Sequence, residues 1–498
     1  MMHQVVGSYL LAEGILLFYM LEHNYEWAFH SLNIGAESLY NTRQGVDTTS
    51  HNMANAQTEG YSRQRVNLTT RDPLSKRNLL IGNGSYIKNI TRSHDQFVEN
   101  QLVKASSAKG ESDAAKNELL ALEEIFNPEL ANSVSDEMNS FFDAINSLAN
   151  FPEELSTRTT VYEQGKNLIA AFKRVDSEVK RNRDGINDSL AHMTGEITDS
   201  LRTIADLNIQ ISQSEVGQQN QANDLRDKRD LLVRNLSEKM DISYYEDKWG
   251  MLTIRGPSDI LMVEGNSAVS FQYQVNSDNE NMYDIIITDF EGDPFRNVTD
   301  AIGAGSLKSM IDVRDRVASN LLKNNNVMAM TFANRFNEIH RDGFGLKDFR
   351  ESRGRNFFDP VTDVDSAAKN LQFSLDIENS VDAIAAASTP NAPGDNIIAN
   401  RLLSLRNEKM LDDGNATFTE HYANYVGNLG IETVRAKHVS EANDILKGSL
   451  ESAREAVSGV SLDEEAANMI KWQTAFTASS KVITTVDEML ETVLSLKR

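Results

Sequence analysis

The chain contains no cysteine. Disulfide bonds, thiolate nucleophiles and cysteine-based zinc or iron–sulfur sites are therefore excluded. The absence would suit a protein that is exported unfolded, although it does not by itself name a compartment. Proline and aromatic residues are also scarce, with 8 prolines among 498 residues and an aromatic share of 7%. Such a composition is typical of a helix-rich protein with modest core side chains.

Positive charge is in deficit as well. The chain has 49 Lys and Arg residues against 73 Asp and Glu, so its formal net charge is −24. Phosphate groups would be repelled, which argues against a nucleic-acid partner and against binding to an anionic membrane surface. A chain of this length is too long for one simple core and predicts two or more domains.

The usual motifs of catalysis and metal binding are missing too. None of the nine histidines forms a HExxH motif or another close ligand pair. There is no GxSxG, and Gly82-Asn-Gly84 lacks the third glycine of a phosphate-binding loop, so it predicts a turn. Asp359, Asp363 and Asp365 alternate, but the further Gly and Glu of a calcium loop are absent, which favours a solvated loop. We expect no enzyme activity, no cofactor and no metal site.

Residues 1–30 form an atypical N-terminal extension. The apolar run Ile15–Leu21 is far shorter than the roughly 20 residues that a membrane-spanning helix needs. The first basic residue is Arg43, so the positively charged start of a secretory signal peptide is missing. We therefore expect no membrane insertion. Two interpretations of the extension remain open: a native amphipathic segment, or a start site assigned upstream of the true one.

The segment 461–498 carries the clearest pattern in the sequence. Ser461 and Glu464 predict a capping box at its start, and no Gly or Pro interrupts it. Apolar residues recur at every seventh position on one face and again on a flanking row. This spacing predicts one long amphipathic helix that buries its apolar side against other helices. The face consists of Leu462, Met469, Phe476, Ile483 and Leu490, and the flanking row of Ala475, Val482, Met489 and Leu496.

A second helix with the same spacing is predicted near the other end of the chain. Small residues accompany its apolar stripe and would let another helix approach closely. We expect segments 31–70 and 459–498 to pack together, although the stripes alone do not decide whether the partner lies in the same chain or in another copy. The stripe is Leu32, Leu39, Val46 and Met53, and the small neighbours are Gly35, Ala36, Thr42 and Thr49.

The middle of the chain alternates between two kinds of pattern. Helical periodicity covers most of it, and the longest run, 157–216, is coiled-coil-like and favours packing within the chain. Short β-rich runs separated by turn residues fill 241–300. We predict a mainly α fold: a long coiled-coil-like helical bundle built from both chain ends, with one small inserted all-β domain. The expected segments are 1–30 (extension), 31–70 (N-terminal axial helix), 71–240 and 301–458 (bundle), 241–300 (β domain) and 459–498 (C-terminal axial helix).

Several local motifs resemble those of a known family. The stretch SHNMANAQTEGYSRQ (50–64) resembles the N-terminal signature of bacterial flagellar rod, hook and hook-associated proteins, and SGVSLDEEAAN (458–468) resembles their C-terminal signature. Four further motifs narrow the resemblance to the hook-associated members: GNGSYI (82–87), DQFVENQL (95–102), DLRDKRDLLV (224–233) and FNEIHRDGF (336–344). The signature positions singled out in the first stretch are Asn52, Asn55, Gly60, Tyr61, Ser62, Arg63 and Gln64.

The resemblance implies a structural subunit of the junction between hook and filament. Family members are secreted by the flagellar type III apparatus without a cleaved signal and lie outside the cell. The implied partners are further copies in a homo-oligomeric ring, the hook protein, a second junction protein, and an export chaperone on the C-terminal helices. The ring is expected to assemble through the two apolar stripes of the terminal helices.

Other interpretations stay open. One is a different flagellar axial subunit, such as a hook-type protein. Another is a secreted helical adhesin or effector that carries an axial export signal. Taken alone, Asn52, Asn55 and Gly60 indicate no more than a helix end and a turn. The resemblance implies a second outer domain in some family members between Phe357 and the C-terminal helices. In this chain that stretch is short, so we expect only one β domain.

Overall fold

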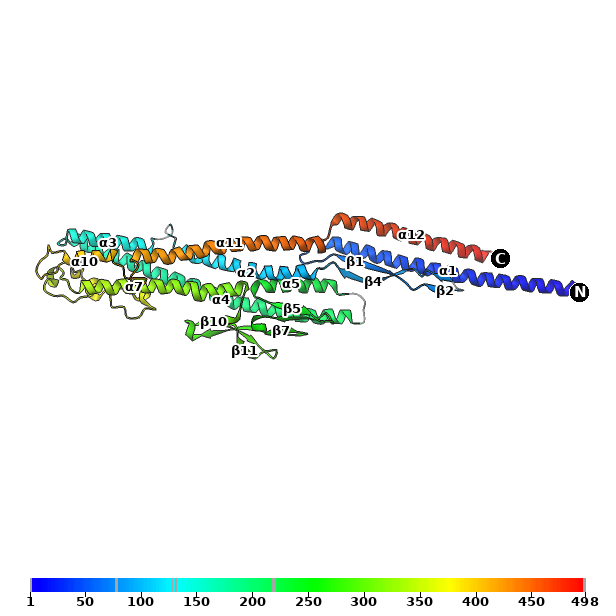
Figure 1. Ribbon diagram of the computed structural model, residues 1–498, viewed down its shortest axis with the longest axis horizontal. Helices are drawn as coiled ribbons and strands as arrows, with labels where there is room; N and C mark the ends of the chain where they lie inside the picture. The colour runs from blue at the N-terminus through cyan, green and yellow to red at the C-terminus, as the bar shows by residue number, and fades with distance from the viewer. Residues whose placement is uncertain (1, 77–78, 128, 130–131, 217–220, 496–498) are drawn as a thin grey trace.

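The computed structural model describes residues 2–76, 79–127, 129, 132–216 and 221–495, with side chains from Trp27 onward except those of residues 76 and 493. The molecule is elongated (Figure 1). A helical bundle with a β domain on one side makes up one part. The other part is a pair of long helices, α1 (Met2–Ala54) and α12 (Leu462–Ser495), which project from one end of the bundle with both termini. The predicted mainly α fold is confirmed.

The bundle helices agree closely with the predicted ranges. The long helix expected over 157–216 is α4. A π-helical turn, Val313–Val317, joins α6 to α7. Thr417 and Glu420 form a reciprocal capping box at the start of α11. The helices are α2 (Gln96–Ile125), α3 (Val134–Asn150), α4 (Leu155–Glu215), α5 (Asn223–Lys239), α6 (Gly305–Asp312), α7 (Ala318–His340), α10 (Ile397–Ser404) and α11 (Phe418–Ser458). Residues 341–417 form short helices and isolated bridges, with no strand.

A cluster of phenylalanines forms the core at the end of the bundle far from the termini. The Phe332 ring lies 5.9 Å from Phe141 and 5.5 Å from Phe418, at the offset and edge-on geometries that aromatic rings prefer. Asn337 supports this core because its side chain bonds the backbone of Phe357 and Phe358. The cluster also includes Phe142, Phe336 and Phe373.

The inserted β domain consists of two small antiparallel sheets on α4. Thr198 Oγ1 of α4 accepts a hydrogen bond from Phe271 N (2.9 Å), and Asn208 accepts from Leu252 N (2.9 Å) and donates to Leu252 O (2.8 Å). All seven strands of this domain lie within residues 241–300, where short β-rich runs were expected. The strands are β5 (Ser243–Glu246), β6 (Leu252–Arg255), β7 (Leu261–Glu264) and β8 (Ser267–Ala268) in one sheet, and β9 (Phe271–Asn276), β10 (Met282–Thr288) and β11 (Pro294–Asn297) in the other.

A second β region runs along α1, and the sequence did not predict it as a unit. Its strands are β1 (Gln64–Thr70), β2 (Leu74–Lys76), β3 (Leu79–Ile81) and β4 (Ser85–Arg92), in which β1 pairs with β4 and β2 with β3. The β1–β4 ladder crosses the predicted boundary at residue 70. Asn41 Nδ2 of α1 donates to Ser85 O (2.8 Å), so the hairpin belongs with the terminal helices rather than with the bundle.

The N-terminal extension continues α1 without a break, since the helix starts at Met2 and not near Leu32. The side chains of the apolar run 15–21 and residues 496–498, including Leu496, lie outside the described residues. In the part of the chain that is described, no helix is long and apolar enough to cross a membrane.

Candidate subunit interface

The two terminal helices pack against each other in antiparallel orientation within one chain, and we call α1 from residue 27 together with α12 the axial pair. Small residues of α1 make this contact possible. A Cβ added to Gly45 would lie 2.4 Å from Cδ2 of Trp472, and one added to Gly35 would lie 2.9 Å from Ile483. Ser38 Oγ lies 2.7 Å from Ser479 Oγ. The predicted pairing of the two end segments therefore occurs in the single chain.

The main contact row of α12 lies beside the predicted apolar stripe, although Ile483 of the stripe also reaches Gly35 of α1. This row runs through Glu465, Trp472, Ser479 and Val486, which repeat every seven residues. Trp472 and Ser479 face Gly45 and Ser38 of α1, Glu465 bonds Asn52, and Val486 is buried. Two of its four members, Glu465 and Ser479, are polar, so a search for apolar residues at every seventh position does not find this row. This row could have been predicted from Trp472, because a side chain as large as tryptophan needs a small residue such as Gly45 opposite it on the partner helix.

The predicted packing residues lie beside the contact row. Leu462 is 53% exposed and Phe476 41% exposed, and Met53 of α1 is also exposed. The other predicted packing residues are half-buried: Leu32, Leu39, Val46, Met469, Ile483 and Leu490.

The stripes of α1 and α12 face the same side of the axial pair. Leu39 and Val46 follow the contact residues Gly35 and Thr42 by four positions, and Phe476 follows Trp472 by four. In an antiparallel pair of right-handed helices, equal offsets from the contact rows rotate toward the same side. Together the two stripes form one apolar band, and we call this the stripe side.

The opposite side of the axial pair is built differently, and we call it the hairpin side. There the β1–β4 hairpin covers α1. Asn41 donates to Ser85 O, and a Cβ added to Gly84 would lie 3.5 Å from the side chain of Ile34. The flanking row of α12 is left open on this side, with Val482 48% exposed and Met489 49% exposed.

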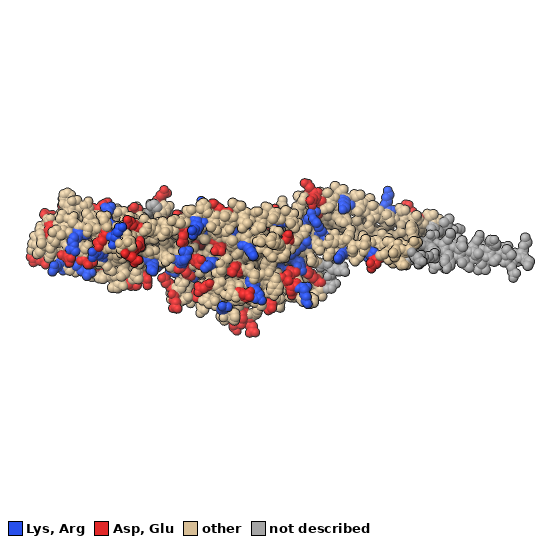
Figure 2. All heavy atoms as spheres, in the orientation of Figure 1, with Lys and Arg blue, Asp and Glu red and all other residues tan. Residues whose placement is uncertain are grey.

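On the face seen in Figure 2, charged side chains are sparser over the axial pair than over the rest of the molecule. Figure 2 shows Lys, Arg, Asp and Glu crowded over the bundle and β domain, whereas few charged residues lie on the visible face of the axial pair. Exposed apolar surface with sparse charge is typical of a surface that is covered in an assembly.

The seven signature residues meet where the axial pair joins the bundle, and we call this cluster the joint. Asn52, on the last turn of α1, is 1% exposed and connects three segments. Its Nδ2 donates to Gln64 O (2.9 Å) and to Glu465 Oε2 (3.2 Å), and its Oδ1 accepts from Tyr61 Oη (2.7 Å). Burial, together with nearby carboxylates, raises the pKa of Tyr61, so the phenol stays protonated and remains a donor.

Arg63 ties the start of β1 to both C-terminal helices. Its Nε donates to Glu465 Oε1 (2.7 Å) and its Nη1 to Glu464 Oε2 (2.6 Å), in the first turn of α12. Its backbone N–H donates to Ser458 O (2.8 Å) at the end of α11. Glu465 is 2% exposed, so Arg63 is the cation that balances a buried carboxylate.

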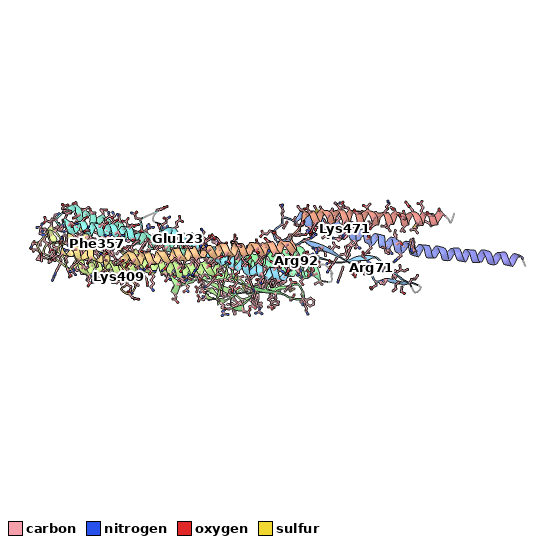
Figure 3. The ribbon with its side chains drawn as sticks, turned by 45° about the horizontal axis from the view of Figure 1, so that its top comes forward. Arg71, Arg92, Glu123, Phe357, Lys409 and Lys471 are labelled. Atoms are coloured by element: carbon pink, nitrogen blue, oxygen red, sulfur yellow. The ribbon has the colours of Figure 1, made fainter. Side chains whose placement is uncertain are left out.

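The motif 224–233 on α5 is the bundle's side of the joint. Asp227 accepts from Ser62 N (2.8 Å) and pairs with Arg92 (2.7 Å), which also pairs with Asp230 (2.7 Å). Figure 3 places Arg92 where the bundle meets the axial pair. Burial raises the pKa of Asp227, and the charge of Arg92 opposes this shift.

Gly60 and Asn55 shape the turn between α1 and β1. Gly60 has a φ of +80°, which glycine adopts without strain, and its carbonyl accepts from Arg454 of α11 (2.7 Å). Asn55 donates from its backbone N–H and its Nδ2 to His51 O, which closes the helix end as expected. The joint therefore holds α1, β1, α5, α11 and α12 in one polar network.

No acidic cluster forms a built metal site among the described residues. Asp289, Glu291 and Asp293 lie close together, but Asp289 Oδ1 accepts three backbone N–H groups of its own turn. In the predicted acidic loop, Asp363 accepts from Asp365 N (3.1 Å) and from Ser366 Oγ (2.5 Å), so it caps a turn.

Two family models match the chain. Residues 119–358 match the model described as flagellar hook-associated protein FlgK helical domain. Residues 452–496 match the model described as flagellar basal body rod FlgEFG protein C-terminal. Together the matched stretches make up more than half of the chain.

Curated relatives and a solved structure agree with these matches. The chain is 27% identical over 503 residues to flagellar hook-associated protein 1 of Bacillus subtilis, covering 94% of this chain and 98% of that protein. It is 21% identical over 554 residues to the protein of the same name from Salmonella typhimurium, covering 94% and 99%. The solved flagellar hook junction protein FlgK from Burkholderia pseudomallei shares the fold, with a TM-score of 0.64 and 14% identity over 72% of this chain and 100% of that one. The chain belongs to the flagellar hook-associated protein family.

Proposed function

We propose that this protein is a structural subunit at the junction between the flagellar hook and filament. The observation that carries the proposal is the axial pair, which has an apolar band on its surface that its own chain leaves half open. The names of the relatives place them at the hook, and the sequence similarity extends over nearly the whole chain. The relatives do not favour a hook-type subunit, an adhesin or an effector.

Assembly through the axial pair is the mechanism. Copies form a ring in which the apolar band of each pair is covered by its neighbours, and a fully buried apolar side chain contributes about 1.5–3 kcal/mol. The predicted packing residues on the two stripes supply this surface. Fixing the backbone of the terminal helices costs roughly 1–2 kcal/mol of conformational entropy per residue. Burial of the apolar band against neighbouring copies offsets this cost, so the terminal helices gain most of their stability on assembly.

The joint sets the direction of the bundle relative to the ring. Asn52 and Arg63 both bind Glu465 at the start of α12. The Arg63 N–H donates to Ser458 O of α11 and the Ser62 N–H donates to Asp227 of α5, which fastens the axial pair to the bundle. A ring built on the axial pairs therefore carries its bundles at a fixed angle, with the β domains on the outside.

The remaining partners follow from the family. The subunit leaves the cell unfolded through the flagellar type III apparatus, lies outside the cell, and contacts the hook protein and a second junction protein. An export chaperone covers the C-terminal helices before export, which suits the exposed apolar residues of α12 such as Leu462 and Phe476. No catalytic step is part of this role.

Location in the cell tests the proposal most simply. Because the chain has no cysteine, a Glu291→Cys variant carries one fluorescent label on the exposed turn of the β domain. A single focus at the hook–filament boundary is expected. Label spread along the hook, or free in the medium of cells with complete flagella, would contradict the proposal.

A substitution on the stripe tests the mechanism. Phe476→Asp is expected to leave the bundle folded but to abolish filaments, because a carboxylate cannot be buried in the apolar band. Thr477→Asp, one residue along on the outward face of α12, is the matched control. Normal filaments on cells that carry Phe476→Asp would overturn the mechanism.

A further inference from the structure

The three-stranded sheet of the β domain, in the order β11-β10-β9, has two edges of different character. β11 begins with Pro294 and carries Arg296, and a proline or a charge on an edge strand discourages another strand from pairing with it. β9 has neither, since its sequence is Phe-Gln-Tyr-Gln-Val-Asn, and its residues 272–275 are all exposed. The β domain projects from the side of the bundle (Figure 1). The edge of β9 is therefore an unprotected strand on a surface other than the axial pair.

The backbone groups of β9 alternate in direction, as they do in every antiparallel strand. Ser270 O accepts from Thr288 N of β10 (2.9 Å), so the even-numbered residues of β9 direct their N–H and C=O groups toward β10. The odd-numbered residues direct theirs away from the sheet. At Phe271 these outward groups bond Thr198 Oγ1 of α4, at 2.9 Å from N and 3.3 Å from O.

Tyr273 and Val275 leave their outward groups without a partner in the part of the chain that the structure describes. We propose that two copies of the subunit pair through β9, antiparallel and about a two-fold axis at Gln274. This register sets Tyr273 of each copy opposite Val275 of the other. Because both residues direct their groups outward, each such pair exchanges both of its N–H···O bonds. The contact joins two three-stranded sheets into one continuous sheet.

The same register brings together side chains that suit one another. Tyr273 is 52% exposed and Val275 is 56% exposed, and an aromatic ring opposite a β-branched side chain is a favourable cross-strand pair. On the other face of the sheet, Gln274 meets its own copy and Gln272 meets Asn276. No like charges lie opposite each other, because β9 carries no charge. A second copy of β9 thus fits the open edge in its hydrogen bonds and in its side chains.

The inference goes beyond the proposed ring. A two-fold contact joins the same surface of two copies and does not repeat around a ring, so this pairing belongs to free subunits. Each copy contributes one strand of 6 residues and carries a net charge of −24, so the pairing is expected to be weak. It is therefore measured at high protein concentration, in salt that screens the repulsion between two acidic chains.

Single-cysteine variants test the register, because the natural chain has no cysteine. Gln274→Cys places a thiol of each copy at the centre of the pair, where opposite Cα atoms lie about 4.5 Å apart, within the range of a disulfide bond. Gln272→Cys, exposed on the same face, is the matched control. Its two copies lie about four residues apart along the strands, roughly 13 Å, which a disulfide bond cannot span. Purified full-length chains are oxidised with diamide, and dimers are quantified on a non-reducing gel.

Disulfide-linked dimers are expected with Gln274→Cys and not with Gln272→Cys. Val275→Pro added to Gln274→Cys should abolish them, because it removes an N–H at the open edge and no bond between β9 and β10. Val275→Lys, a charge of the kind that protects other edges, should act in the same way, and unchanged thermal melting shows that the fold is intact. Equal dimer formation by the two cysteine variants, dimers that persist with both substitutions of Val275, or no dimers with Gln274→Cys would each overturn the inference. None of these outcomes bears on the proposed ring, which the location of the labelled subunit tests.

Discussion

The helices of the bundle and those of the axial pair differ in how much of their apolar surface their own chain buries. In the bundle, α4 buries apolar residues along its whole length, from Val161 to Ile211, against other parts of the same chain. In the axial pair, Glu465 and Val486 are the only buried residues among those described in α12. Both helices show regular apolar spacing in the sequence. Regular spacing therefore predicts a helix with a packing face, but it does not reveal whether the chain itself covers that face.

The same contrast appears in the polar groups. The bundle buries arginines beneath its surface; Arg229, for example, is 0% exposed and donates to Asn208 Oδ1 (3.0 Å) and Gly250 O (2.6 Å). The axial pair has its buried charges only at the joint. A rigid attachment at one end and half-covered helices beyond it suit a part that is completed by neighbours.

The largest effect is expected from cutting the joint. Arg63→Ala leaves the buried carboxylate of Glu465 without its cation, and breaking a buried pair in this way costs about 3–5 kcal/mol. Hydrogen exchange should accelerate over residues 462–495 while the melting of the bundle is unchanged. Arg65→Ala, two residues further along and exposed, is the matched control. Equal exchange of α12 in both variants would mean that the joint does not hold the axial pair.

A core substitution should give the reverse pattern. Phe332 is 0% exposed, and Phe332→Ala is expected to lower the unfolding free energy of the bundle by about 3–5 kcal/mol through lost burial and a new cavity. Exchange in the axial pair should stay as in the natural chain. Leu375→Ala, at an exposed apolar position, is the control for loss of apolar volume. If α12 also became unprotected, the two parts would not be independent.

Acid should weaken the bundle through one histidine. His340 is buried, accepts from Ala385 N (2.9 Å) and lies 2.9 Å from Arg355 O, and burial lowers its pKa to about 4. The unfolded chain, with a pKa of about 6.5, binds a proton that the folded chain does not between these values. Stability is therefore complete above about pH 6.5 and falls by up to about 3 kcal/mol as the pH drops to 4. Thermal melting of His340→Gln should lack this part of the pH dependence, and an unchanged profile would exclude His340 as its source.

The smallest effects concern two glycines in helices. In Gly45→Ala the new methyl group overlaps the indole of Trp472, and such overpacking costs about 1–3 kcal/mol. In Gly185→Ala on α4 nothing lies within 4 Å of the new Cβ, so the better helix former should stabilise the bundle by up to about 1 kcal/mol. Exchange of α12 and melting of the bundle measure the two changes. If Gly185→Ala destabilised the bundle, or if Gly45→Ala left the exchange of α12 unchanged, the difference in packing around the two glycines would be wrong.

Much of the fold was predictable from local pattern. The helix start at Ser461, whose Oγ accepts from Glu464 N (3.4 Å), and the turn at Gly60 were found because they depend on neighbouring residues. The partners of Arg63 and Asp227 were not, because they are distant in sequence and the signature motif gives no hint of which charges meet. The β1–β4 hairpin was split for the same reason, because β1 pairs with β4 across the intervening β2 and β3.

The candidate interface was predictable only in part. The apolar stripes and the small residues of α1 were visible in the sequence, and pairing of the terminal segments was expected. Ile483 and Gly35 of this contact were among the predicted residues, but Trp472 and Ser479 were not, since Trp472 lies between polar positions at Glu465 and Ser479. Three of the stripe residues, Met53, Leu462 and Phe476, are exposed in the single chain. They remain candidates for packing between subunits.

Hydrogen exchange of α12 in the free subunit and in isolated junctions tests the central claim most directly. Helices that lack partners open locally at low free energy, whereas core helices exchange only through global unfolding. In a demonstrated monomer, residues 462–495 are expected to exchange much faster than the buried positions of α4, and to become protected in the junction. If α12 in the monomer were as protected as α4, with no further change on assembly, the axial pair would be complete in the single chain and the account would be contradicted.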